Sequence, residues 1–298
     1  MSTDDAKIRP TGGADSRSFS QHGWRRRLLR AAGMLFVVYW TVFALLLLLE
    51  NKLLFHPVRA SDDWVDPTLV GLPAEDVAFF CQDGTQIHAW WCPDGGDASA
   101  GAVLHCHGNA GNLSHRVYQI KDWQKFISLP VLIFDYPGYG KSGGKVGEAG
   151  CYAAAEAAFD WLTTTKRIAA EKIILYGDSL GGAVAVQLAR TRPHRALVLN
   201  RTFTSIPDVA QHLYPFFPAR WFIRNRFDCA AKIGECHRPV FIAHGDADRL
   251  VPFALGEQLY EKANEPKEFF VMAGADHNDP VPPEFYGHLR EFLEKHAK

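Results

Sequence analysis

The feature that most constrains the fold is a serine placed between two glycines, Gly177-Asp178-Ser179-Leu180-Gly181. An apolar run at 172–176 precedes it and an Ala- and Val-rich stretch at 180–192 follows it, so the sequence predicts a strand, a sharp turn and a helix. Such a turn lifts the serine clear of the sheet, and its strain is tolerated only where the residues two before and two after it are small. The two glycines therefore favour Ser179 as a nucleophile.

Beyond residue 75, short apolar runs alternate with longer amphipathic stretches, a pattern typical of a sheet covered by helices. The runs are continuously apolar, as in parallel strands buried on both faces, and they predict strands at 102–106, 131–135, 172–176, 196–199, 240–244 and 269–272. The stretches between them predict helices at 113–126, 149–164, 180–192, 254–264 and 282–296. An Asp83-Gly84 pair predicts a hairpin of 77–81 and 86–91. The expected class is α/β, with a mostly parallel central sheet and helices on both faces.

The N-terminal part of the chain has a different character. Residues 31–49 form a run of 19 residues without charge that ends in five leucines, and an arginine cluster at 25–30 precedes it. At about 1.5 Å of rise per residue, a helix of this length is close to the roughly 30 Å hydrocarbon core of a bilayer. We therefore expect a disordered polar tail at 1–23, a basic flank and transmembrane anchor at 24–50, and a linker at 51–75.

Two alternatives for the apolar run are a buried core helix and a cleaved signal peptide. A signal peptide has a shorter apolar region, roughly 7 to 15 residues, followed by a small-x-small cleavage site, and the segment at 50–55 offers no such site. Basic residues beside a span tend to stay in the cytoplasm. The arginine cluster thus predicts a single-pass protein with a cytoplasmic N-terminus and its larger domain on the non-cytoplasmic side.

A serine nucleophile needs a base that accepts its proton and an acid that orients this base. His277 follows the last predicted strand, whereas His288 and His296 belong to a terminal helix, so His277 is the predicted base. Asp246 and Asp248 both follow the preceding strand and compete as the acid. Asp248 lies farther into its loop and is favoured, while Asp246 would help to hold the turn.

Charge that develops on an attacked carbonyl needs two backbone N–H donors. Leu180, directly after the serine, is expected to supply one, and Asn109, in the loop at 107–112, the other. A metal site is the alternative for His105-Cys106-His107, because alternation puts both imidazoles on one face of a strand. No carboxylate or cysteine follows at ligand spacing, so we expect no metal here. We also expect no cofactor, because a serine triad needs only water to release the acyl group.

An insertion interrupts the alternation of strands and helices. About 40 residues separate Leu199 from Val240, more than an ordinary connection. They are rich in aromatic side chains: Tyr214, Phe216, Phe217, Trp221, Phe222 and Phe227. The part near 203–237 is either a short lid over the active site or a surface whose aromatic residues pack on the domain or against a membrane.

Taken together, six segments resemble the Bem46-like branch of the α/β-hydrolases, which includes membrane-anchored members. They lie in the expected order over roughly residues 76–290, and they are 107–112 (HGNAGN), 135–140 (DYPGYG) with Ser142, 177–182 (GDSLGG), 202–205 (TFTS), 244–248 (HGDAD) and 276–278 (DHN). The resemblance implies an α/β-hydrolase fold with its catalytic domain at 76–298, and it supports Asp248 as the acid because the family's acid ends the His-Gly-x-x-Asp motif. The sequence departs from relatives at Asn200-Arg201, which concerns the substrate pocket and not the triad.

The resemblance does not identify the substrate, because this fold hosts esterases, thioesterases, lipases and peptidases. An anchor and an aromatic insertion favour a small-molecule or acylated substrate, hydrolysed as an ester or thioester through an acyl-enzyme at Ser179. A serine peptidase or amidase and a non-catalytic membrane scaffold are the alternatives. The expected partner is the lipid bilayer, through residues 31–49. A net charge of -1 and a pI near 6.9 give no electrostatic case for binding nucleic acid.

Overall fold

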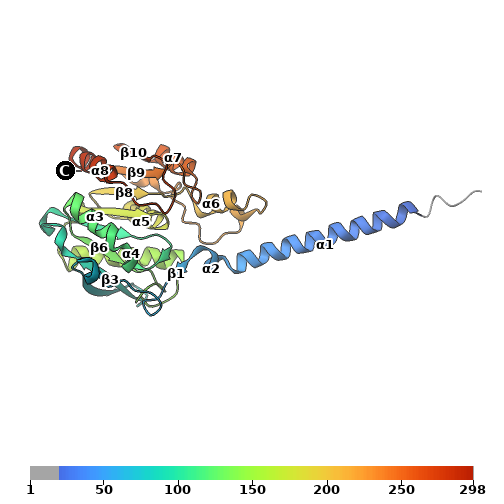
Figure 1. The fold of residues 1–298 in the computed structure, drawn as a ribbon, viewed down its shortest axis with the longest axis horizontal. Coiled ribbons are helices and arrows are strands. Elements are labelled where there is room, and N and C mark those ends of the chain that lie inside the picture. The colour runs from blue at the N-terminus through green and yellow to red at the C-terminus, as the bar shows by residue number, and fades with distance from the viewer. Residues whose placement is uncertain (1–19, 298) are drawn as a thin grey trace, which may run out of the picture. The chain divides into compact units, whose positions relative to one another are not determined.

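The computed structural model describes residues 20–297, which divide after Leu48 into two compact units. Most of the tail expected at 1–23 lies outside the described residues. The described part of the first unit is one helix, α1 (Ser20–Leu48; Figure 1). The stretch Gly23–Leu48 spans 26 residues. Its most apolar 18-residue segment has a mean hydropathy of 2.3, and only 6% of that segment is buried. This helix is therefore long and apolar enough to cross a membrane, and it is not the buried core helix considered above.

The second unit is built on an eight-stranded sheet with the order β10-β9-β8-β7-β4-β6-β3-β2. β2 (Glu75–Phe80) and β3 (Gln86–Cys92) form the predicted hairpin, and β3 also pairs antiparallel with β6. The remaining pairs are parallel and join β4 (Ala102–Cys106), β6 (Val131–Phe134), β7 (Ile173–Asp178), β8 (Ala196–Asn200), β9 (Val240–Gly245) and β10 (Lys267–Met272). The mostly parallel sheet is thus confirmed.

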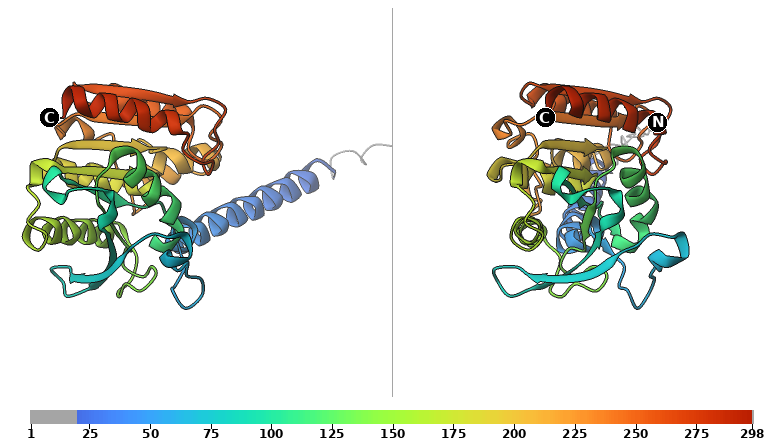
Figure 2. Two further views of the ribbon diagram at one scale, coloured as in Figure 1. Left: turned by 60° about the vertical axis from the view of Figure 1, so that its left-hand side comes forward. Right: turned by 90° about the vertical axis from the view of Figure 1, so that its left-hand side faces the viewer.

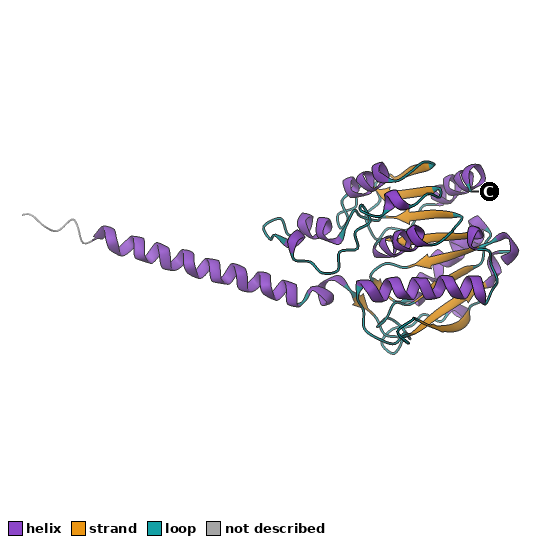
Figure 3. Cartoon of the chain, turned by 180° about the vertical axis from the view of Figure 1, so that it is seen from behind, coloured by secondary structure: helices purple, strands orange, loops and turns teal. Residues whose placement is uncertain are grey.

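Helices cover both faces of this sheet (Figures 2 and 3). One hydrophobic cluster holds Leu104 of β4 together with side chains of α4 (Glu148–Thr164), α5 (Leu180–Thr191) and α7 (Phe253–Lys262). The other holds the neighbouring Val103 together with side chains of α3 (Val117–Ile127) and α8 (Pro283–His296). Because successive side chains of a strand point to opposite faces, both residues must be apolar, which explains the continuous apolar runs.

The segment expected to be a linker at 51–75 is part of the second unit. It contains α2 (Glu50–Leu54) and β1 (His56–Pro57), and β1 pairs in parallel with β5 (Ala110–Gly111). Between α2 and β1, Phe55 is 2% exposed and its ring packs edge-on against Phe227. Burial of this large apolar side chain holds the segment against the domain, which a polar linker could not do.

The insertion before β9 contains one α-helix, α6 (Ile206–Leu213). Ser205 caps this helix, because its hydroxyl accepts a hydrogen bond from the N–H of Asp208. The aromatic side chains of the insertion fall into two groups. Phe227 is fully buried, whereas Phe216 and Trp221 are 85% and 82% exposed. The segment thus packs on the domain at its C-terminal end and exposes apolar groups at its tip.

Candidate active site

Ser179 occupies the turn between β7 and α5 with a positive φ of 52°. Its N–H donates a hydrogen bond to the carbonyl of Asn200 on the neighbouring strand. A Cβ on Gly177 would come within 2.4 Å of the backbone of Gly181, and a Cβ on Gly181 within 2.0 Å of the carbonyl oxygen of Cys106. Both glycines are therefore required by close packing, as the sequence motif predicts.

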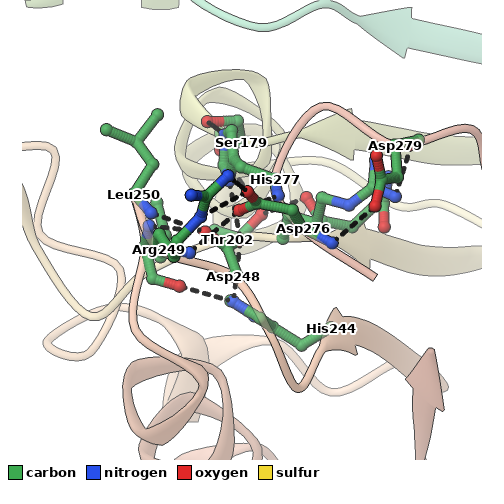
Figure 4. A network of polar contacts seen from close by, with 12 residues as sticks. Ser179, Thr202, His244, Asp248, Arg249, Leu250, Asp276, His277 and Asp279 are labelled. Carbon is green, nitrogen blue, oxygen red and sulfur yellow. Dashed lines mark hydrogen bonds and ion pairs between the residues drawn. The ribbon is translucent and has the colours of Figure 1, made fainter. Parts of the chain in front are cut away.

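Three residues from the C-terminal ends of β7, β9 and β10 meet beside this turn (Figure 4). The Nε2 atom of His277 lies 3.0 Å from the Oγ atom of Ser179. On the other side of the ring, the Nδ1 atom lies 2.7 Å from a carboxylate oxygen of Asp248. The structure thus brings together all three residues that the sequence singles out, in the order acid, base and nucleophile.

Asp248 is buried, and its carboxylate is surrounded by donors. Burial alone raises the pKa of Asp248, but hydrogen bonds from His244, His277 and the N–H of Val251 outweigh it, so the net pKa lies well below its usual range. Its Oδ1 atom accepts N–H bonds from Leu250 and Val251, which leaves Oδ2 for the imidazole. The carboxylate is therefore ionised at neutral pH and fixed in orientation.

The competing candidate, Asp246, has a different role. Its carboxylate accepts a 2.6 Å hydrogen bond from the N–H of Gly274, in the turn after β10. It joins the loops that follow β9 and β10, as expected for an aspartate that holds a turn. The described contacts of Asp246 do not include the imidazole of His277.

Sequence reasoning missed a second link between the acid loop and the base loop. The residue after the acid, Arg249, donates two hydrogen bonds from its guanidinium and one from its N–H to Asp276, the residue before the base. The N–H of His277 donates to the same carboxylate. These donors, Arg249 first, lower the pKa of Asp276 to about 2. The sequence shows that Arg249 follows Asp248 and that Asp276 precedes His277. It does not show that Arg249 pairs with Asp276.

The expected oxyanion donors also lie beside the serine. Leu180 begins α5, and a Cβ on Gly108 would lie 3.7 Å from the Cβ atom of Ser179, which places the loop of Asn109 next to the nucleophile. The side chain of Asn109 faces elsewhere, because its Nδ2 atom donates to the carbonyl of Leu54. Among residues 20–297, no hydrogen-bond acceptor is found for the backbone N–H of either Leu180 or Asn109. Both donors are therefore available to a ligand.

His105 and His107, considered above as metal ligands, are fully buried and have structural neighbours. The ring of His105 packs against Tyr176 with a centroid distance of 4.7 Å, and burial holds its pKa well below the usual value. The Nδ1 atom of His107 lies 2.7 Å from the carbonyl oxygen of Gly108, and its Nε2 atom lies 3.5 Å from the carboxylate of Asp135. The described contacts of the two rings are thus a ring contact for His105, and a hydrogen bond and a nearby carboxylate for His107.

A pocket of about 480 Å³ opens over the serine, a volume typical of small-molecule sites. Ser179, Leu180, Asn109 and His277 all line it. The other walls come from the segment after α1, the loop between β4 and α3, the insertion with α6, and the acid loop. A ligand bound here would lie beside Ser179, Leu180 and Asn109.

Comparisons with known proteins agree with this architecture. A family model described as "alpha/beta hydrolase fold" matches residues 101–225. The "Alpha/beta hydrolase domain-containing protein WAV2" of Arabidopsis thaliana is 32% identical over 280 residues, which are 85% of this chain and 90% of that protein. The "Uncharacterized protein Rv2307c" of Mycobacterium tuberculosis is 40% identical over 210 residues, 70% of this chain and 74% of that protein.

Solved structures give the same fold. An esterase of Pyrococcus furiosus, Pf2001, superimposes with a TM-score of 0.66 at 21% identity, covering 82% of this chain and 99% of its own. The ferulic-acid complex of Est1E from Butyrivibrio proteoclasticus superimposes with a TM-score of 0.61 at 20% identity, covering 74% and 99%. On the family match, the relatives and the observed sheet, this chain belongs to the α/β-hydrolase family.

Proposed function

We propose that the protein is a membrane-anchored serine hydrolase that cleaves a carboxylic ester or thioester. The observation that carries the proposal is the chain of contacts from Asp248 through His277 to Ser179, next to a pocket and two free backbone N–H groups. A strained serine turn costs about 1–3 kcal/mol. A scaffold that only binds has no use for this strain, which argues against the non-catalytic alternative.

In the proposed reaction, His277 Nε2 takes the hydroxyl proton of Ser179 as the serine oxygen attacks the acyl carbonyl. The N–H groups of Leu180 and Asn109 stabilise the negative carbonyl oxygen. The bond to the leaving alcohol or thiol then breaks, and His277 returns the proton to that group. Water attacks the acyl-enzyme in the same way, which releases the carboxylic acid and restores the serine.

The ionised Asp248 contributes in two ways. It holds the imidazole of His277 with Nδ1–H toward the carboxylate, so that Nε2 is free to accept the serine proton. It also stabilises the imidazolium that forms in each attack. The names of Pf2001 and Est1E, an esterase and a protein bound to ferulic acid, support ester chemistry over the peptidase alternative.

We place α1 in a bilayer, with the arginine cluster at 25–30 on the cytoplasmic side and the catalytic unit on the other side. A hydrolase held at a membrane acts on substrates that are delivered there, and acyl esters and thioesters partition into such surfaces.

Fluorophosphonate labelling of the detergent-solubilised full-length protein tests the proposal, with Ser179→Ala as the matched variant. We expect the wild type to be labelled and to hydrolyse p-nitrophenyl butyrate, and the variant to do neither. Hydrolysis that persists in Ser179→Ala, or folded wild type that resists the label, would reject Ser179 as the nucleophile. Faster turnover of aminoacyl amides than of p-nitrophenyl esters would favour a peptidase instead.

A further inference from the structure

The walls of the pocket differ in chemistry. One part is apolar and comes from the insertion and the acid loop, with Phe203, Ile206, Val209, Leu213, Leu250 and Val251. Another part is basic and comes from β1 and the loop before α3, with His56, His115 and Arg116. A pocket with these two walls fits a ligand that has an apolar chain and a polar, electron-rich end.

Arg116 is the permanently charged group on the basic wall. One guanidinium nitrogen donates to the carbonyl of Ala110 at 2.6 Å. The Nε atom is buried, and within the described part of the chain it has no hydrogen-bond acceptor. Arg116 also forms no ion pair with any described carboxylate. The Nε atom itself is out of reach of a ligand, but the guanidinium has five N–H donors, the contact with Ala110 uses one of them, and Arg116 lines the pocket, so an anion there can accept from the others.

The acidic groups near this wall already have partners. Asp63, which does not line the pocket, lies 3.2 Å from the Nε2 atom of His115. Asp178, which also lines the pocket, accepts a hydrogen bond from the side chain of Asn200. Neither carboxylate forms an ion pair with Arg116, so the guanidinium has no direct anionic partner among the described residues.

We infer that the substrate is an acyl ester whose other end carries an anionic group, a phosphate monoester or a carboxylate, bound by Arg116. The guanidinium of arginine matches the planar oxygens of such groups and forms charge-assisted hydrogen bonds with them. The acyl chain lies along the apolar wall of α6. This assignment rests on the proposed function and adds the chemical class of the substrate to it.

The chain segment that joins the surroundings of Ser179 to Arg116 is short. Gly108 lies beside Ser179, and the chain runs from there through β5 to Arg116 within eight residues. The loop that carries the Asn109 donor therefore also carries the anion-binding side chain. A substrate held by Arg116 would have its ester near the serine and the oxyanion donors, so binding of the anion also orients the ester.

The test compares three octanoyl esters on the full-length protein in neutral detergent micelles: 1-octanoylglycerol, 1-octanoylglycerol 3-phosphate and octanoylglycolate. Release of octanoic acid gives kcat/KM for each. We expect the wild type to prefer an anionic ester about tenfold, as one charge-assisted contact provides. A preference for the phosphate or for the glycolate identifies which anion the site takes.

Three variants assign this preference. Arg116→Gln should lose the preference for the anionic ester, mainly through a higher KM for that ester, so that kcat/KM falls more for the anionic than for the neutral ester. Arg116→Lys should keep part of it, because the charge remains and the forked geometry is lost. Lys125→Gln, on the exposed face of α3 outside the pocket, should behave as the wild type.

The outcomes separate the two proposals. Equal turnover of all three esters by the wild type would overturn the anionic subsite and leave the hydrolase intact. An equal loss on neutral and anionic esters in Arg116→Gln would make Arg116 a structural residue and would also overturn the subsite. If the wild type cleaves none of these esters and resists fluorophosphonate, both proposals fail.

Discussion

The carboxylate of Asp248 links the active site to the pH dependence of stability. Its pKa is about 3.9 in an unfolded chain and lower in the folded protein. Its stabilising contribution is therefore complete above about pH 4 and is lost as the pH falls through the folded value. We expect the melting temperature of the wild type to fall more steeply below pH 4 than that of Asp248→Asn, as followed by scanning fluorimetry.

Asp94→Asn is the control for this measurement, because Asp94 is exposed and lies away from the pocket. Its profile should follow that of the wild type. Parallel profiles for Asp248→Asn and the wild type would mean that the native contacts of Asp248 contribute no pH-dependent stability.

Arg249 is expected to act on catalysis without touching the substrate. It ties the acid loop to the base loop through Asp276, so Arg249→Gln should loosen the alignment of His277 with Asp248. We expect kcat for p-nitrophenyl butyrate to fall about tenfold with little change in KM, since a misplacement of 1 Å can cost about a hundredfold. Arg290→Gln, exposed on α8, serves as the matched control.

The same residues show which parts of the site can be predicted from the sequence. Ser179, Asp248 and His277 each follow a predicted strand, and strand ends converge in an α/β sheet, so their meeting could be predicted. Arg249 and Asp276 pair between two loops whose spatial relation depends on the register of β9 and β10. One sequence does not contain that register, so these partners could not be found.

At the scale of elements, the carboxylate of Glu50 fastens the C-terminal end of the insertion. It accepts hydrogen bonds from the backbone N–H groups of Arg224 and Asn225 and from the amide of Asn225. Burial alone raises the pKa of Glu50, but these hydrogen bonds lower it overall, so the group is charged when it binds. The insertion is thus attached to α2 at residues 224 and 225, and its exposed tip with Phe216 and Trp221 comes just before this attachment in the chain.

Glu50→Gln should weaken this attachment by about 1 kcal/mol, the difference between a charge-assisted and a neutral hydrogen bond. We expect trypsin to cleave at Arg220 or Arg224 faster than in the wild type, read by mass spectrometry of short digests. Glu257→Gln on the exposed face of α7 is the control. An unchanged cleavage rate would show that Glu50 does not restrain the insertion.

Some helices and strands could be predicted from the sequence and others could not, for physical reasons. Long apolar runs predicted all six parallel strands, with each end within two residues of the observed one, because only buried strands tolerate such runs. The two-residue strands β1 and β5 were missed, since two residues carry no periodicity. The insertion was seen as aromatic, but its division into a buried end and an exposed tip depends on packing against Phe55, far away in the chain.

For the whole molecule, the division after Leu48 predicts that the catalytic unit folds without the helix. A protein that begins at Leu49 should keep its melting temperature within a few degrees and its turnover of p-nitrophenyl butyrate within about twofold. It should no longer sediment with membranes, whereas the full-length protein should. A truncated protein that aggregates or loses activity would show that α1 contributes to the fold of the second unit.

In a protein anchored by α1 as we propose, the pairing of β1 with β5 has a consequence for proteolytic release from the membrane. Residues 54–58 hold the loop of Asn109 through hydrogen bonds at Leu54, His56 and Val58. A protease that cuts before Leu49 would release the whole second unit, with the proposed catalytic residues and β1 intact. A cut a few residues later, after Val58, would shed a domain that has lost the strand supporting its oxyanion loop. For the proposed hydrolase, the position of the cut within the ten residues 49–58 would thus decide whether release changes only its location or also removes its activity.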